Sequence, residues 1–70
     1  MILQNVGQRI RDLRNEQGLS QEKLALKAEI DRTYLAGVEQ GKRNLSIKSL
    51  DKILKALDIT FKDFFKEIEC

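Results

Sequence analysis

The sequence predicts an all-α fold of five short helices joined by short loops, and three observations support this class. No segment shows the sustained alternation of apolar and polar residues that is expected of a half-buried strand. The chain contains no proline, and residues that favour helix N-termini occur at four places. Apolar residues recur at helical spacing, and the first such stripe consists of Ile2, Val6, Ile10 and Leu13.

Each of the four N-terminal signals is a small polar residue with an apolar residue one position before it and another four positions after it. Such a residue accepts hydrogen bonds from free backbone N–H groups, while the apolar pair packs across the start of the helix. The four capping residues are Ser20, Asp31, Ser46 and Thr60. With a first helix that Gly18 is placed to end, the predicted helices are 4–17, 20–28, 31–40, 46–57 and 60–68.

Seventy residues are enough for one domain, which we expect to span residues 1–70. The core of a chain this short contributes only about 3–5 kcal/mol of stability. Cys70 is the only cysteine and there is no histidine, so an internal disulfide and a Cys/His metal site are both excluded. We therefore expect close helix packing, dimerisation, or both.

The composition also excludes several classes of protein. No apolar run is long enough for a signal-peptide core or a membrane span, and a lone thiol fits a reducing compartment, so we expect a cytoplasmic protein. The chain lacks histidine, a glycine-rich phosphate loop and a cysteine with a neighbouring base. We therefore expect no enzyme activity, no cofactor, no small-molecule substrate and no membrane partner.

The second and third predicted helices are separated by about three residues, which is the plan of a helix-turn-helix over about 20–40. The outer face of the third helix carries Arg32, Thr33, Ala36, Gly37 and Gln40. An arginine can bind guanine through two hydrogen bonds, and a threonine can contact a base edge or a thymine methyl group. The small residues would let the helix approach a groove closely. The alternative is an ordinary amphipathic helix with a small-residue packing face.

Basic residues follow this helix and indicate a surface for nucleic acid. Between positions 40 and 55 the chain has five basic residues, Lys42, Arg43, Lys48, Lys52 and Lys55, against one acidic residue. The alternative is a solvated polar face. The candidate contacts to the DNA backbone or groove are the amide of Gln21, the hydroxyl of Tyr34, and Gln40, Lys42, Arg43 and Asn44.

The C-terminal part of the chain is more apolar than a small monomer easily covers, which predicts dimerisation through helices at about 46–68. The candidate interface residues are Leu50, Leu54, Phe61, Phe64 and Phe65. A two-fold dimer would place two recognition helices about 34 Å apart, matching half-sites one helical turn apart. The alternative is that all three phenylalanines belong to the core of a single chain.

Four segments together resemble the Cro/C1-type (Xre) family of bacterial and phage regulators, and the resemblance runs from about Val6 to Phe65. The segments are Leu19–Ala25, Asp31–Leu35, Val38–Asn44 and Ser49–Leu57. The resemblance implies a five-helix, lambda-repressor-like DNA-binding domain that binds an operator in double-stranded DNA as a homodimer. At the matching positions it implies phosphate binding by Gln21, base contacts by Arg32 and Thr33, and a pair between Arg14 and Glu39. Glu29 stands where the family usually has glycine.

Within the family, Asp31–Tyr34 with Gly37, and then Arg43–Leu45, are most similar to the controller proteins of restriction–modification systems. That resemblance implies a palindromic operator beside the protein's own gene and the endonuclease gene, with activation at low dose and repression at high dose. RNA polymerase is then a further candidate partner. Two alternatives stay open, namely an antitoxin-type autorepressor that also binds a toxin, and a protein-interaction module that does not bind DNA.

Overall fold

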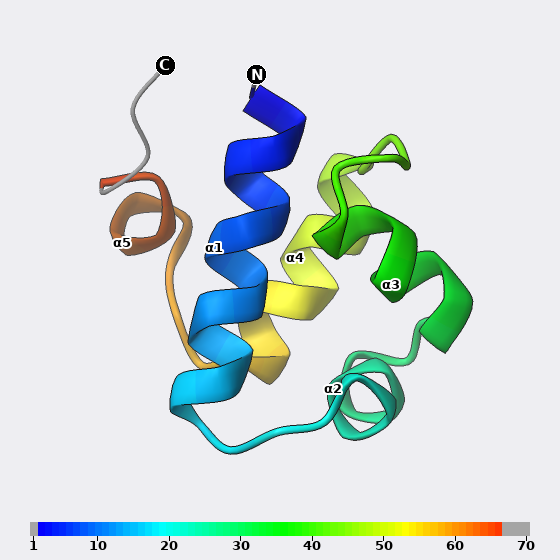
Figure 1. Ribbon diagram of the computed structural model, residues 1–70. Coiled ribbons are helices and arrows are strands. Elements are labelled where there is room, and N and C mark those ends of the chain that lie inside the picture. Colours follow the sequence, from blue (N-terminus) through cyan, green and yellow to red (C-terminus); the bar gives the residue numbers. More distant parts are fainter. Residues whose placement is uncertain (1, 67–70) are drawn as a thin grey trace.

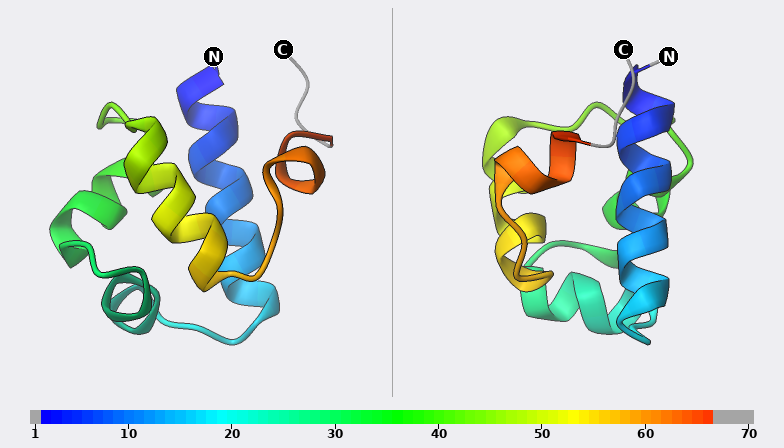
Figure 2. Two further views of the ribbon diagram at one scale, coloured as in Figure 1. Left: turned by 180° about the vertical axis from the view of Figure 1, so that it is seen from behind. Right: turned by 90° about the vertical axis from the view of Figure 1, so that its left-hand side faces the viewer.

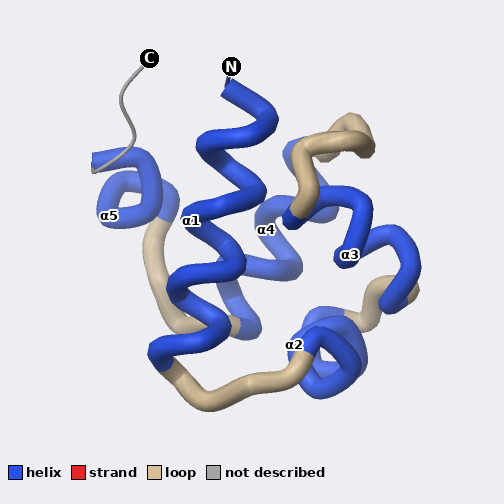
Figure 3. The backbone as a smooth tube through the Cα atoms, in the orientation of Figure 1, coloured by secondary structure: helices blue, strands red, loops and turns tan. Residues whose placement is uncertain are grey.

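A computed structural model of the chain describes residues 2–66, which form five α-helices and no strand (Figures 1 and 3). The helices are α1 (Ile2–Glu16), α2 (Gln21–Ala28), α3 (Arg32–Glu39), α4 (Ile47–Ala56) and α5 (Phe61–Lys66). The all-α, five-helix prediction is confirmed. The first helix begins two residues earlier than expected, and the predicted end of the last helix at residue 68 lies outside the described residues.

All four predicted N-caps are present. The side-chain oxygen of each capping residue accepts a hydrogen bond from the backbone N–H three positions later, at 3.0–3.3 Å. The capping residues are Ser20, Asp31, Ser46 and Thr60. Because each cap satisfies an N–H group that has no partner inside its helix, it determines where that helix begins.

The turn between α2 and α3 contains Glu29 in the left-handed conformation, with φ of 58°. Its backbone N–H closes the end of α2 by donating to carbonyl groups of the preceding turn. A side chain in this conformation costs about 1–2 kcal/mol. The glutamate thus occupies a position where glycine would be less strained, and the turn forms nonetheless.

The helices surround one apolar core, with α2 packed against α3 and α4, α1 against α3, and α4 against α5 (Figure 2). The largest buried side chains are Ile10, Leu24, Leu35, Ile53, Leu54, Leu57 and Phe64. The amide nitrogen of Gln17 donates to the carbonyl of Leu57 at 2.7 Å and ties the end of α1 to the end of α4. Between residues 2 and 66, no helix has the length and apolar character needed to cross a bilayer.

Helices α1 and α3 approach closely at Gly7. A Cβ atom at this position would overlap the backbone carbonyl oxygen of Val38 and would lie 3.0 Å from that of Glu39. A glycine inside an apolar helical stripe is the sequence signal for such an approach, but Gly7 was not among the predicted functional residues. Gly7 therefore sets the distance between α1 and the helix that carries the candidate site.

Candidate nucleic-acid interface

Helix α3 presents one face to solvent and the other to the core. Leu35 and Val38 are buried on the inner face. Arg32, Thr33 and Gln40 are exposed, whereas Ala36 and Gly37 are half-buried. The structure thus brings the predicted base-contacting residues onto one surface, with Arg32 and Thr33 at the N-terminal end of the helix.

The loop between α3 and α4 folds back over α3 through Tyr34 and Arg43. The hydroxyl of Tyr34 donates to the carbonyl oxygen of Asn44 at 3.0 Å. The guanidinium carbon of Arg43 lies 5.5 Å from the centre of the Tyr34 ring, within range of a cation–π interaction. We expected the Tyr34 hydroxyl to donate a hydrogen bond to a DNA phosphate. In this structure it donates to the carbonyl of Asn44 in the loop instead.

Gly37 contacts the loop that follows α3, which its position in the helix did not predict. A Cβ atom there would overlap Cγ of Arg43 and would lie 3.3 Å from its Cδ. The stem of Arg43 therefore fills the space left by the missing side chain, which was predicted to allow close approach to DNA. The backbone N–H of Lys42 also donates to the carbonyl of Gly37 at 2.9 Å. These contacts hold the basic loop beside α3, with Lys42, Arg43 and Asn44 exposed.

A buried ion pair lies behind α3. Arg14 of α1 donates to both carboxylate oxygens of Glu39, from Nε at 2.8 Å and from Nη2 at 3.0 Å. The two residues are 9% and 6% exposed. Arg14 Nη1 also donates to the carbonyl of Leu19 at 2.7 Å, just before α2 begins. The pair implied by the family resemblance thus connects α1, α3 and the loop that leads into α2.

Gln21, the first residue of α2, joins this ion pair. Its Nε2 donates to Glu39 Oε1 at 3.1 Å. Gln21 is half-buried. Gln21 was predicted to bind phosphate, but its contact with Glu39, eighteen positions away, was not predicted. No local pattern predicts a contact between two helices at that separation.

The predicted dimer interface requires a correction. Leu50, Leu54 and Phe64 are 4%, 1% and 0% exposed, so they belong to the core of the chain and cannot contact a partner in this fold. Phe61 and Phe65 are 37% and 39% exposed. Of the five predicted interface residues, only these two rings of α5 are therefore exposed enough to contact a partner.

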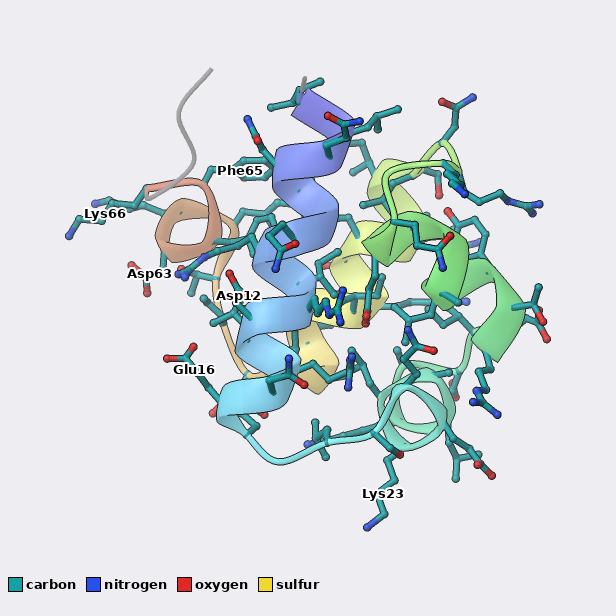
Figure 4. All side chains as sticks on the ribbon, viewed as in Figure 1. Asp12, Glu16, Lys23, Asp63, Phe65 and Lys66 are labelled. Carbon is teal, nitrogen blue, oxygen red and sulfur yellow. The ribbon has the colours of Figure 1, made fainter. Side chains whose placement is uncertain are left out.

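The two exposed rings form a small aromatic surface. Phe61 and Phe65 are stacked with their centroids 6.5 Å apart, and Phe65 also meets the buried ring of Phe64 edge-on at 5.0 Å. Figure 4 shows Phe65 on the side of the molecule where charged residues of α1 and α5 also lie, namely Asp12, Glu16, Asp63 and Lys66. Exposed aromatic residues are enriched at protein–protein interfaces.

Comparison with known proteins places this geometry in a family. The sequence profile of a helix-turn-helix family matches residues 10–64. Control protein C.MunI of a Mycoplasma species is 44% identical over 64 residues, which cover 90% of this chain and 86% of that protein. Control protein C.BamHI of Bacillus amyloliquefaciens is 43% identical over 58 residues, which cover 81% and 72%.

Solved structures show the same similarity. The restriction–modification controller protein C.AhdI from Aeromonas hydrophila superposes with a TM-score of 0.87 at 48% identity, covering 90% of this chain and 96% of that one. The controller protein C.Esp1396I, as a tetramer in complex with its natural 35-base-pair operator, superposes with a TM-score of 0.89 at 44% identity, covering 94% and 87%. The chain belongs to the helix-turn-helix family of the Cro/C1 type, and its relatives include the controller proteins of restriction–modification systems.

Proposed function

We propose that this chain is a cytoplasmic transcriptional regulator, the controller protein of a restriction–modification system, and that it binds a palindromic operator as a homodimer. The observation that carries the proposal is the exposed face of α3, which has Arg32 and Thr33 at one end and the basic loop of Lys42 and Arg43 folded beside it. The same fold at 44% identity is bound to operator DNA in C.Esp1396I.

Two kinds of contact follow from this arrangement. Arg32 and Thr33 contact base edges in the major groove and determine which sequence is bound. Lys42, Arg43 and Gln21 contact phosphates or the groove wall and determine where the protein sits on the duplex. The loop contacts of Tyr34 and Arg43 keep the basic side chains close to α3, so less conformational freedom is lost on binding.

Helix α5, which carries the aromatic surface, lies on the opposite side of the molecule from α3 (Figure 1). In a two-fold dimer with recognition helices about 34 Å apart, each helix lies about 17 Å from the axis. The protein extends 29 × 23 × 21 Å, so a distance of about 17 Å between α3 and the axis fits within the dimensions of one protomer. We therefore propose that the dimer contact lies at Phe61 and Phe65 of α5.

Selection of bound duplexes from a randomised DNA library at near-physiological salt tests the proposal. We expect enrichment of a palindrome with half-sites about 10 base pairs apart. The location of that sequence in the source genome, beside an endonuclease gene or elsewhere, then tests the controller assignment. A folded protein that enriches no sequence would contradict the proposal and would favour a protein-interaction module or an antitoxin that needs its partner to bind.

A further inference from the structure

The orientation of the Gln21 amide follows from the chemistry of its partner. A carboxylate only accepts hydrogen bonds, so Glu39 can bind only the NH2 end of the Gln21 amide. Nε2 lies 3.1 Å from Glu39 Oε1, and this contact uses one of its two N–H groups. The second N–H stays available on the same nitrogen. Glu39 thereby holds the NH2 end of the Gln21 amide, and not its oxygen, beside the carboxylate.

A phosphate also only accepts hydrogen bonds, so a side chain that binds it must present a donor. Gln21 stands at the start of α2, directly after the capping residue Ser20. Backbone N–H groups at a helix N-terminus add a favourable field for an anion. An amide free to rotate would present its oxygen part of the time and would repel the phosphate in that orientation.

An unpaired carboxylate near a phosphate would repel it, because both groups are negatively charged. Arg14 neutralises the charge of Glu39. It donates to both oxygens of Glu39, at 2.8 and 3.0 Å, so the pair is electrically neutral as a unit. Arg14 also binds the carbonyl of Leu19, which precedes the cap of α2. The carboxylate is held in one place and cannot turn toward the DNA.

We propose that Glu39 is a positioning residue for DNA binding, which holds the Gln21 amide with a free N–H for a backbone phosphate while Arg14 neutralises the carboxylate. This inference rests on the proposed function. Glu39 does not touch DNA in this scheme, and its effect passes through Gln21. The contribution of Gln21 to affinity must therefore depend on the presence of Glu39.

A double-mutant comparison measures this dependence. Gln21→Ala is made in the parent and in a background carrying Arg14→Met and Glu39→Met, because replacing a buried ion pair by apolar residues of similar volume commonly preserves folding. Binding to the selected operator duplex is measured for all four proteins. We expect Gln21→Ala to weaken binding about tenfold in the parent, the effect of one hydrogen bond to a charged group, and less than about twofold in the methionine background.

Gln17→Ala is the matched control, since the Gln17 amide also forms a hydrogen bond within the fold but at the α1–α4 junction. It should change DNA affinity by the same factor in both backgrounds. If Glu39 acted only in folding, the methionine background would unfold at a lower temperature than the parent. Gln21→Ala would then weaken DNA binding by the same factor in both backgrounds. Equal Gln21→Ala losses in the two backgrounds would thus overturn the role of Glu39, whereas a parent that binds no duplex would overturn the proposed function itself.

Nuclear magnetic resonance of the unsubstituted, DNA-free protein provides a second test that does not depend on the variants folding. The side-chain NH2 group of Gln21 should exchange with water more slowly than that of exposed Gln40. On addition of the operator duplex, the Gln21 side-chain resonances should shift and exchange more slowly still. A Gln21 amide that matches Gln40 in the free protein would overturn the proposal.

Discussion

Replacing Gly7 by alanine tests the spacing between α1 and the recognition helix α3. A Cβ atom at this position would overlap the Val38 carbonyl oxygen, and ordinary carbon–oxygen contacts lie at about 3.3–3.6 Å. The obstacle is backbone, which cannot rotate away, so α1 and α3 must separate. Overpacking of this kind costs about 1–3 kcal/mol, and we expect the upper end of that range. Alanine regains about 1 kcal/mol of helix propensity, which leaves a net loss of about 2 kcal/mol.

Gly37→Ala is the matched substitution, because Gly37 also lies inside a helix. Its Cβ would meet the side chain of Arg43, which can move to another rotamer. The gain of about 1 kcal/mol in helix propensity is then offset by a side-chain rearrangement of about 0.5–1.5 kcal/mol. We expect nearly unchanged stability but weaker DNA binding, since Arg43 loses its place over Tyr34.

Thermal unfolding of both variants, at one protein concentration, separates the two effects. For a domain of this size, a loss of about 2 kcal/mol lowers Tm by about 8–16 °C. We expect such a decrease for Gly7→Ala and little change for Gly37→Ala. A Gly7→Ala protein as stable as the parent would refute the close α1–α3 approach, and unchanged DNA affinity of Gly37→Ala would refute the role assigned to Arg43.

Four further substitutions test the interface and the turn. Arg32→Ala should cost about 1–3 kcal/mol on the selected operator and relax preference at one base position; an unchanged preference in a repeated selection would remove Arg32 from the base-contacting set. Lys42→Ala should weaken binding to all duplexes alike and reduce the salt-dependence slope by about 1; titrations at several salt concentrations measure this, and an unaltered slope contradicts it. Phe65→Ala should weaken both dimerisation and cooperative DNA binding, with a loss of about 2 kcal/mol in dimerisation because a central aromatic residue of an interface contributes about this much. Sedimentation that still shows a full dimer would place the interface elsewhere. Glu29→Gly should raise stability by about 0.5–1 kcal/mol, because relief of left-handed strain exceeds the entropy cost of glycine; denaturant unfolding without that gain would argue against the strain.

Much of the helical organisation was predictable because its signals are local. The caps at Ser20, Asp31, Ser46 and Thr60 act on N–H groups three positions away, within reach of the chain's own geometry. The exposed position of Arg32 and Thr33 also followed from helical periodicity, once Leu35 and Val38 were assigned to the core.

The aromatic end of the chain shows why the rest could not be predicted. Phe64 and Phe65 are neighbours in sequence and equal in chemistry, yet one is fully buried and the other is 39% exposed. Adjacent helical residues point about 100° apart, so the docking angle of α5 on α4 decides which ring enters the core. Composition predicts more apolar residues in this segment than the core can bury, but it does not say which of them are exposed.

The sequence by itself determined the number and order of the helices, where α2 to α5 begin, and the exposure of Arg32 and Thr33 on the recognition helix, since each of these depends on residues a few positions apart. Tertiary structure alone decided the contact of Arg43 with Gly37 and the bond between Gln21 and Glu39. The first depends on how a loop folds back, and the second on how α2 and α3 cross. Both are set by packing of the whole core, which no short segment encodes.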